Sequence, residues 1–215
     1  MSGRFAPDTP LYSALSWISS LVVISLCWAL TGSVVVTGGA ALVGAFAACM
    51  SLIGGGKVFR TFFRSFGKAF LPATLAWLFD LVVGGLIAWE LLVVSRISVG
   101  ALRYAIVVVL FLALGLLAIV NVWFWPVLAR RALEDRPAGV GYLPTLAKAS
   151  LLAGFRYLPM TVVGVVIFVA PVLLALQSPR LGATVALVFA VFGMAFCCYL
   201  VTLLLRKELD VQIED

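Results

Sequence analysis

Histidine is absent from this chain of 215 residues, and charged residues make up only 11% of it. Without histidine, imidazole general bases, Ser-His-Asp triads and histidine-ligated metals are excluded. The four cysteines, Cys27, Cys49, Cys197 and Cys198, each lie within an apolar run, and none belongs to a C-x-x-C pair. We expect inert packing thiols, with a vicinal Cys197–Cys198 redox or soft-metal pair as the alternative.

Catalytic motifs are missing as well. The chain has no P-loop, no G-x-S-x-G sequence and no metal-ligand cluster, and serines such as Ser33, Ser51 and Ser150 have no base to activate them. The sequence therefore predicts a protein that is not an enzyme, with no catalytic residue, no cofactor and no metal site.

Apolar residues are abundant instead. The hydrophobic set makes up 64% of the chain before its 19 glycines are added, whereas a typical soluble domain holds roughly 45–50% apolar residues with glycine included. A soluble fold of this size could not bury so much apolar surface. The composition therefore predicts an integral membrane protein, and the long apolar runs predict a single all-α domain, a polytopic bundle of transmembrane helices.

A transmembrane helix needs about 20 apolar residues to cross roughly 30 Å of hydrocarbon. Six runs meet or approach this length, and they cover approximately 11–36, 40–56, 71–94, 100–128, 158–176 and 181–205. The second run is the shortest and is rich in small residues. We predict six spans, with five as the alternative if the second run is re-entrant.

Basic residues predict the orientation, because cytoplasmic segments carry an excess of lysine and arginine. With a cytoplasmic N-terminus, Arg96, Arg103 and Arg180 fall outside the cell, and the other basic residues fall inside. Those inside are Arg4, Lys57, Arg60, Arg64, Lys68, Arg130, Arg131, Arg136, Lys148, Arg156, Arg206 and Lys207. The net charge of +6 is thus a topology signal. It predicts a multi-pass protein of the plasma membrane with a cytoplasmic C-terminus, a retained first span and no nucleic-acid partner.

Residues 57–70, KVFRTFFRSFGKAF, form the first predicted cytoplasmic amphipathic helix. On a helical projection four cations lie within about 80°, and five phenylalanines lie within about 100° on the far side. The cations are Lys57, Arg60, Arg64 and Lys68, and the phenylalanines are Phe59, Phe62, Phe63, Phe66 and Phe70. The pattern is typical of a helix in the membrane interface, with phenylalanines toward lipid and cations toward anionic headgroups. The alternative is an extension of a neighbouring span that packs on the bundle, and either helix could dock a partner.

Residues 143–157 form the second predicted amphipathic helix, with a poorer separation of faces. The two connections share an ending, GKAFLPAT from Gly67 to Thr74 and GFRYLPMT from Gly154 to Thr161. Each ending lies between a span that enters the cytoplasm and one that leaves it, as in the parallel repeats of some transporters. Chance or convergence is the alternative, because proline is common in the first turn of any helix.

Asp80 lies deep in the third run, about eight residues or 12 Å from Pro72. Asn121 lies at a matching depth in the fourth run. Because an ionised carboxylate at this depth costs on the order of 3 kcal/mol, we hypothesise that Asp80 is neutral and hydrogen-bonded to Asn121. The pair would hold the two helices together through a hydrogen bond or, alternatively, act as a proton-coupling or substrate-binding site.

Glu90 lies near the outer end of the third run, close enough in depth to Arg96 and Arg103 to pair with them. An interfacial ion pair is one interpretation, and an external charge that faces a substrate is the other. Four aromatic residues are expected to anchor the chain at the level of the headgroups. They are Trp89, Tyr104, Trp123 and Trp125.

The run CWALTGSVVVTGGAALVGAFAACMSLIGGG, followed by KVFRTFFRSFGKAFLPATLAW, resembles the YesL-like family of bacterial integral membrane proteins. The likeness rests on Trp28, on the turn at 35–38, on the phenylalanine-rich basic helix, and on Thr74 and Trp77 at the start of the next span. The later WFWPVLAR and FRYLP resemble the family's downstream signature, so the likeness covers most of residues 12–175. The proline and asparagine that the family often has near the first turn are absent.

The resemblance implies a poorly characterised protein of the bacterial inner membrane, often associated with carbohydrate uptake, and it transfers no catalytic residue. We therefore predict a non-enzymatic accessory protein whose amphipathic helices contact lipid, sugar-transporter subunits or a second copy of the chain. The alternative is a small secondary transporter in which Asp80, Asn121 and Glu90 line a path.

Overall fold

The computed structural model describes residues 10–94, 96, 100–134 and 139–209, and within these ranges the chain is helical and contains no strand. The helices are α1 (Pro10–Gly32), α2 (Gly38–Ile53), α3 (Val58–Lys68), α4 (Phe70–Val94), α5 (Gly100–Leu133), α6 (Leu143–Arg156), α7 (Leu158–Leu176), α8 (Pro179–Val188) and α9 (Met194–Leu209). Short helical turns are η1 (Val35–Thr37), η2 (Val140–Tyr142) and the π-helical η3 (Phe189–Gly193). The all-α fold predicted from the composition is confirmed.

Six helical segments of the described residues are long and apolar enough to cross a membrane. They are Leu11–Gly32, Val35–Ile53, Phe70–Val94, Gly100–Leu133, Leu158–Leu176 and Pro179–Glu208. These segments correspond to the six predicted runs, with shifted ends. The first helix ends at Gly32 because Val34 adopts an extended backbone before η1 begins. The fourth continues past residue 128 to Leu133 and contains Pro126.

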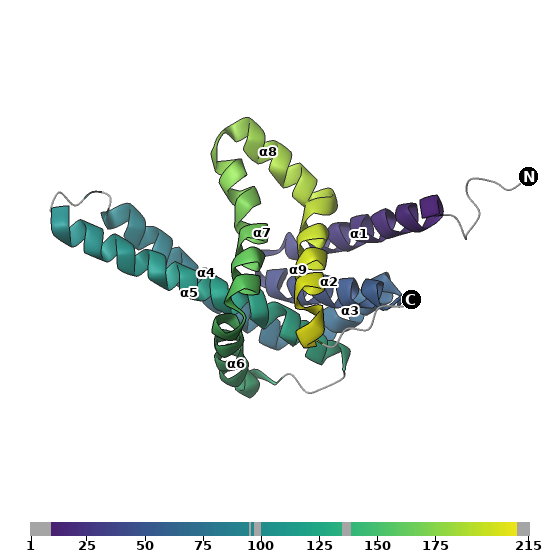
Figure 1. Ribbon diagram of the computed structural model, residues 1–215. Helices are drawn as coiled ribbons and strands as arrows, with labels where there is room; N and C mark the ends of the chain where they lie inside the picture. Colours follow the sequence, from purple (N-terminus) through teal and green to yellow (C-terminus); the bar gives the residue numbers. More distant parts are fainter. Residues whose placement is uncertain (1–9, 95, 97–99, 135–138, 210–215) are drawn as a thin grey trace, which may run out of the picture.

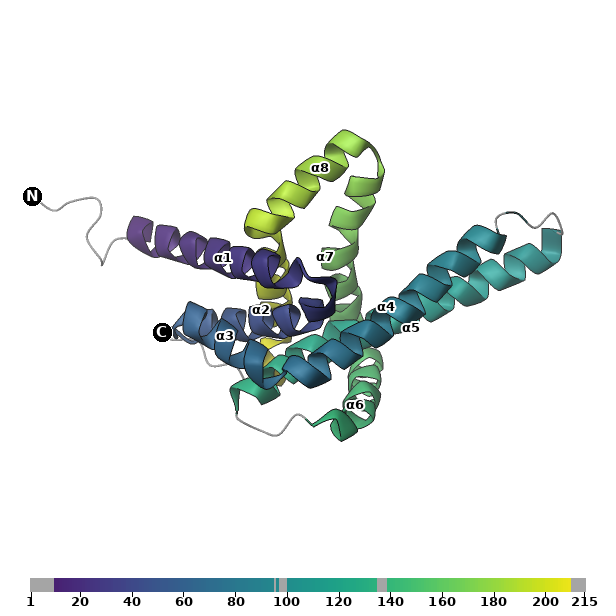
Figure 2. The ribbon, with the colours of Figure 1, turned by 180° about the vertical axis from the view of Figure 1, so that it is seen from behind.

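Three helical limbs diverge from a common centre (Figure 1). α1 extends to one side, the α4–α5 hairpin extends to the opposite side, and α7 with α8 forms the third limb (Figures 1 and 2). Large apolar side chains cover these limbs, among them Leu112 at 63% exposure and Leu176 at 78%. Surfaces of this kind are suited to contact with hydrocarbon rather than water.

α2 lies at the centre of the molecule. Fourteen of its 16 residues are buried, and it packs against α1, α3, α4, α5 and α9. Glycine and alanine make up half of the helix, and small residues let neighbouring backbones approach closely. The shortest of the predicted spans is therefore the central helix, on which most of the others pack.

α3 and α6 each fold back on the helix that precedes them, so that α3 packs most extensively on α2 and α6 on α5. Gly55, with a positive φ of 68°, lies in the turn between α2 and α3, a conformation that favours glycine. α3 is therefore a separate helix rather than an extension of α2.

The phenylalanine face of α3 is divided between the core and the surface. Phe62 is completely buried against Gly44, and Phe66 is half-buried. Phe59 and Phe63 are exposed. The prediction that Phe62 belongs to a lipid or partner surface is therefore wrong, because α3 lies close enough to α2 for a glycine to receive its ring.

The packing of α1 on α9 includes a buried hydrogen bond at the end of the π-helical turn. The backbone N–H of Ala195 donates to Ser25 Oγ at 3.1 Å, so a side chain of α1 satisfies a backbone donor of α9. The cysteines in this region and elsewhere are free and buried, as expected for packing thiols.

Candidate functional site

A cavity of about 620 Å³ lies between α4, α5 and the start of α6. The described residues that line it are apolar except for Asp80 on α4 and Asn121 on α5. Phe79 and Phe124 belong to its walls, and Ala147 is one of four residues from α6. The cavity is therefore an apolar space with one carboxyl group and one amide group.

Asp80 is half-buried and lies within side-chain hydrogen-bonding reach of Asn121. Asn121 is held by two further bonds: its Nδ2 donates to the Leu117 carbonyl oxygen at 3.0 Å, and its Oδ1 accepts from Trp125 Nε1 at 2.5 Å. The structure thus brings together the two residues that were paired by their matching depth. A functional role for the pair stays a prediction.

An aromatic contact links the hydrogen-bonded residues Asn121 and Trp125 to η1. The rings of Trp125 and Trp77 meet edge to face with centroids 6.1 Å apart, and Trp77 Nε1 donates to the Val35 carbonyl oxygen at 2.8 Å. Gly39 allows the approach of α2 to α4, since a Cβ on this residue would lie 2.3 Å from the Ala73 carbonyl oxygen. The turn at 35–38 and Trp77, which both contribute to the family resemblance, are therefore in contact.

Two of the four expected headgroup anchors lie in the core. Trp123 and Trp125 are 3% and 5% exposed, and the prediction was wrong because the protein itself supplies hydrogen-bond acceptors for both indoles. Trp89 and Tyr104 are 65% and 74% exposed. Their role as anchors stays a prediction.

Glu90 lies on the exposed surface of α4, and the cavity lining does not include it. Within the described part of the chain it forms no ion pair with Arg96 or Arg103. All three side chains are exposed near the tip of the α4–α5 hairpin, where solvation offsets most of the attraction between opposite charges. The structure therefore does not contain the expected ion pair.

The junction of α6 with α7 is a network of buried and half-buried groups. Trp123 Nε1 donates to Thr161 Oγ1 at 2.9 Å. The Thr161 hydroxyl in turn donates to the Gly154 carbonyl oxygen at 3.0 Å. The Trp123 ring stacks on Tyr157 at a centroid distance of 5.4 Å. The WFW and FRYLP sequences are thus parts of one contact.

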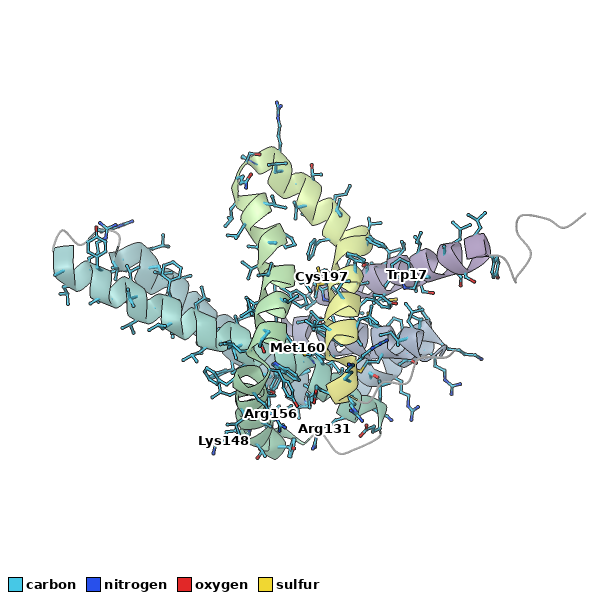
Figure 3. All side chains as sticks on the ribbon, viewed as in Figure 1. Trp17, Arg131, Lys148, Arg156, Met160 and Cys197 are labelled. Carbon is cyan, nitrogen blue, oxygen red and sulfur yellow. The ribbon has the colours of Figure 1, made fainter. Side chains whose placement is uncertain are left out.

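Three of the basic residues assigned to the cytoplasmic side lie at one end of the molecule. Figure 3 shows Arg131, Lys148 and Arg156 at the same end of the molecule. Arg131 donates to Tyr142 Oη at 2.7 Å, and Tyr157 Oη donates to Glu208 Oε2 at 2.7 Å. This bond to a carboxylate is the main reason that the pKa of Tyr157 is raised above its ordinary value. Two residues of the predicted topology signal, at positions 4 and 136, lie outside the described residues.

The four cations at positions 57, 60, 64 and 68, in α3 and just before it, are exposed, and their contact with lipid or a partner stays a prediction. The ring of Phe59 meets that of Phe63 at 4.9 Å, and Phe63 meets the buried Phe62 at 5.2 Å. The exposed aromatic pair is thus fixed to the core by ring contacts. In the described residues, no group of three potential metal ligands comes together.

Apolar helices of spanning length, packed around a helix of small residues, define a multi-pass α-helical membrane protein. Residues 21–91 match the model of a family described as "Protein of unknown function, DUF624", which is the YesL-like family of bacterial membrane proteins. The matched segment contains η1, α2, α3 and most of α4, so the predicted resemblance is confirmed over this part of the chain. No curated protein and no solved structure matches the chain.

Proposed function

We propose that this protein is a non-enzymatic accessory component of a membrane transport system and that it binds its partner through the outer face of α3. The observation that carries the proposal is the exposure of Phe59 and Phe63, at 61% and 43%, beside the exposed cations Lys57 and Arg60. Exposed aromatic side chains next to basic ones are typical of binding hot spots.

The anchoring of α3 supports this use of its outer face. Phe62 fixes the inner side of the helix in the core, so the outer side chains are presented on a rigid support and lose little entropy when they bind. The partner that we propose is a subunit of a sugar-uptake system, because the family resemblance implies such an association. Anionic lipid is the competing occupant for a basic aromatic helix.

Crosslinking of the tagged protein in native membranes, followed by mass spectrometry, tests the proposal. We expect transporter subunits among the products, and we expect them to disappear when Lys57 and Arg60 are both replaced by glutamate. Arg103→Glu, which reverses an exposed charge on α5, should leave the products unchanged. Recovery of the chain crosslinked to itself alone would contradict an accessory role.

A second candidate function is that of a small secondary transporter. The cavity favours it, because Asp80 and Asn121 face an apolar space between two helices of spanning length, and ionisable residues within spans often mark transport pathways. Flux into proteoliposomes should then fall in Asp80→Asn and persist in Glu90→Gln. Unchanged flux in Asp80→Asn would exclude this function.

A further inference from the structure

We propose that the cavity between α4, α5 and α6 binds an amphiphilic organic cation, with the charged group of the ligand against the Asp80 carboxyl group and its apolar body against the walls. The proposal concerns binding, so it depends neither on the docking role of α3 nor on transport. It assigns a ligand class to a space that the fold leaves open.

The charge of the ligand follows from the lining of the cavity. Among its described lining residues Asp80 is the ionisable one, and lysine and arginine do not occur there. Asn121 already bonds to Leu117 and Trp125 within the protein. Its amide therefore orients Asp80 more than it recognises a ligand. A carboxylate in apolar surroundings needs a cation or a proton, and an anionic ligand would meet repulsion.

The size and surroundings of the cavity indicate an apolar body. A volume of about 620 Å³ falls within the range of roughly 300–1,000 Å³ that is usual for small-molecule sites. Leu75, Phe79 and Leu116 line the cavity and are also exposed on the outside of the hairpin, at 41%, 65% and 45%. Both helices are long and apolar enough to span a membrane, so in a bilayer this exposed side would contact hydrocarbon, and a ligand that arrives from the bilayer must itself be largely apolar.

Aromatic faces and fixed neighbours add to the fit. Phe79 of α4 and Phe124 of α5 both line the cavity, and aromatic rings attract cations electrostatically. Trp125 holds Asn121 through a hydrogen bond, and its ring packs on Trp77. The polar end of the cavity is thus supported by packed residues before any ligand enters, which lowers the entropic cost of binding.

Binding of tetraphenylphosphonium to the purified protein tests the proposal. The protein is placed in nanodiscs of zwitterionic lipid at about pH 8, and binding to protein-free nanodiscs is subtracted. Tetraphenylborate has the same shape and the opposite charge, so it serves as the matched probe. We expect saturable binding of the phosphonium ion, no saturable binding of the borate ion, and affinity for phosphonium at least about tenfold weaker in Asp80→Asn.

Two further variants control for charge elsewhere and for the cavity itself. Glu90→Gln removes a carboxylate from the same helix outside the cavity, so it should bind phosphonium as the parent protein does. Ala147→Trp fills the cavity from α6 without a change of charge, so it should abolish binding. Binding is compared only for variants whose elution volume and melting temperature match those of the parent protein.

Three results would overturn the proposal. The first is equal phosphonium affinity in the parent protein and Asp80→Asn, and the second is equal saturable binding of the borate ion. The third is undiminished phosphonium binding in Ala147→Trp, which would place the ligand elsewhere. If Asp80→Asn does not fold, Ala147→Trp and the borate probe still decide between the outcomes. If the protein binds the phosphonium ion but does not transport it, the result counts against the transporter function and leaves the binding proposal intact.

Discussion

In α2–α3–α4 and in α5–α6–α7, a span, an amphipathic helix folded back on it and a second span follow one another in the same order. In the first unit the leading helix contributes the small residues. Gly39 of α2 receives Trp77 of α4, and Gly44 of α2 receives the Phe62 ring of α3. Large side chains of the following helices thus pack into glycine positions of the leading one.

The second unit reverses this arrangement. The leading helix α5 contributes Ile119 and Val122, and the following helices contribute glycines. A Cβ on Gly154 of α6 would lie 2.3 Å from Ile119 Cγ2, and a Cβ on Gly164 of α7 would lie 2.8 Å from Val122 Cγ1. Close packing therefore requires a small residue on one side of each contact, but either helix can supply it.

The similar sequences Gly67–Thr74 and Gly154–Thr161 also differ in the surroundings of their corresponding residues. Gly67 of α3, which corresponds to Gly154, would place a Cβ where no described heavy atom lies within 4 Å. Thr74, which corresponds to Thr161, has a buried hydroxyl that makes no hydrogen bond within the described part of the chain. Similar sequence at the two junctions thus coexists with different surroundings, and substitutions at the matched positions should have different effects.

The largest effect is expected for Gly39→Ala. Its Cβ would lie 2.3 Å from the Ala73 carbonyl oxygen and 2.6 Å from Trp77 Cβ, and a backbone atom cannot move aside without shifting a helix. We expect the free energy of unfolding in detergent to fall by about 3 kcal/mol. Gly84→Ala in α4, where no described atom lies within 4 Å of the new Cβ, is the matched control. Equal melting temperatures for the two variants would contradict the packing of α2 on α4.

The paired variants Gly154→Ala and Gly67→Ala test directly whether these two glycines have different surroundings. We expect Gly154→Ala to lose about 2 kcal/mol, because the Ile119 methyl group occupies the space. Gly67→Ala lies in an open part of α3, and it should gain up to about 1 kcal/mol because alanine favours the helix. Thermal unfolding of the two proteins side by side measures the difference. Destabilisation by both substitutions would mean that the two junctions have the same surroundings.

A smaller difference is expected between Thr161→Val and Thr74→Val. The first substitution leaves the buried Trp123 indole N–H without its acceptor, and we expect a loss of about 1–2 kcal/mol. The second replaces a hydroxyl that has no described partner, so stability should stay the same or rise. A greater loss in Thr74→Val than in Thr161→Val would count against the described hydrogen bonds.

The smallest effect is expected for Tyr157→Phe, and it should depend on pH. The bond to Glu208 raises the pKa of Tyr157 in the folded protein above the unfolded value of about 10. The stabilisation is therefore complete below about pH 10 and is lost as the pH rises through the folded pKa. The melting temperatures of the parent protein and the variant should differ at about pH 8 and converge as the pH rises above the unfolded pKa of about 10. A constant difference over this range would exclude the bond as its cause.

The spans could be predicted from the sequence because a helix that crosses a bilayer must be long and apolar, and an apolar run of that length is visible in the sequence. The pairing of Asp80 with Asn121 could be predicted because depth along a helix follows from residue number. The sequence also predicted two amphipathic helices with nearly correct ends. These properties are local or depend on the membrane alone.

The environment of individual aromatic residues could not be predicted. A tryptophan near the end of a span fits the headgroup region and the protein core equally well, and the contacts that decide for Trp123 and Trp125 come from α4 and from the α6–α7 junction. Periodicity likewise identified the phenylalanine face of α3, but it could not show that α2 would cover Phe62 and leave Phe59 exposed.

The basic residues predict that α3 and α6 lie on the same side of the membrane. Labelling of Lys57→Cys, Lys148→Cys and Arg103→Cys with a membrane-impermeant maleimide tests it most directly, because the native cysteines are buried. In intact cells Arg103→Cys should react, and in inverted vesicles Lys57→Cys and Lys148→Cys should react. Labelling of positions 57 and 148 from opposite sides would contradict the account.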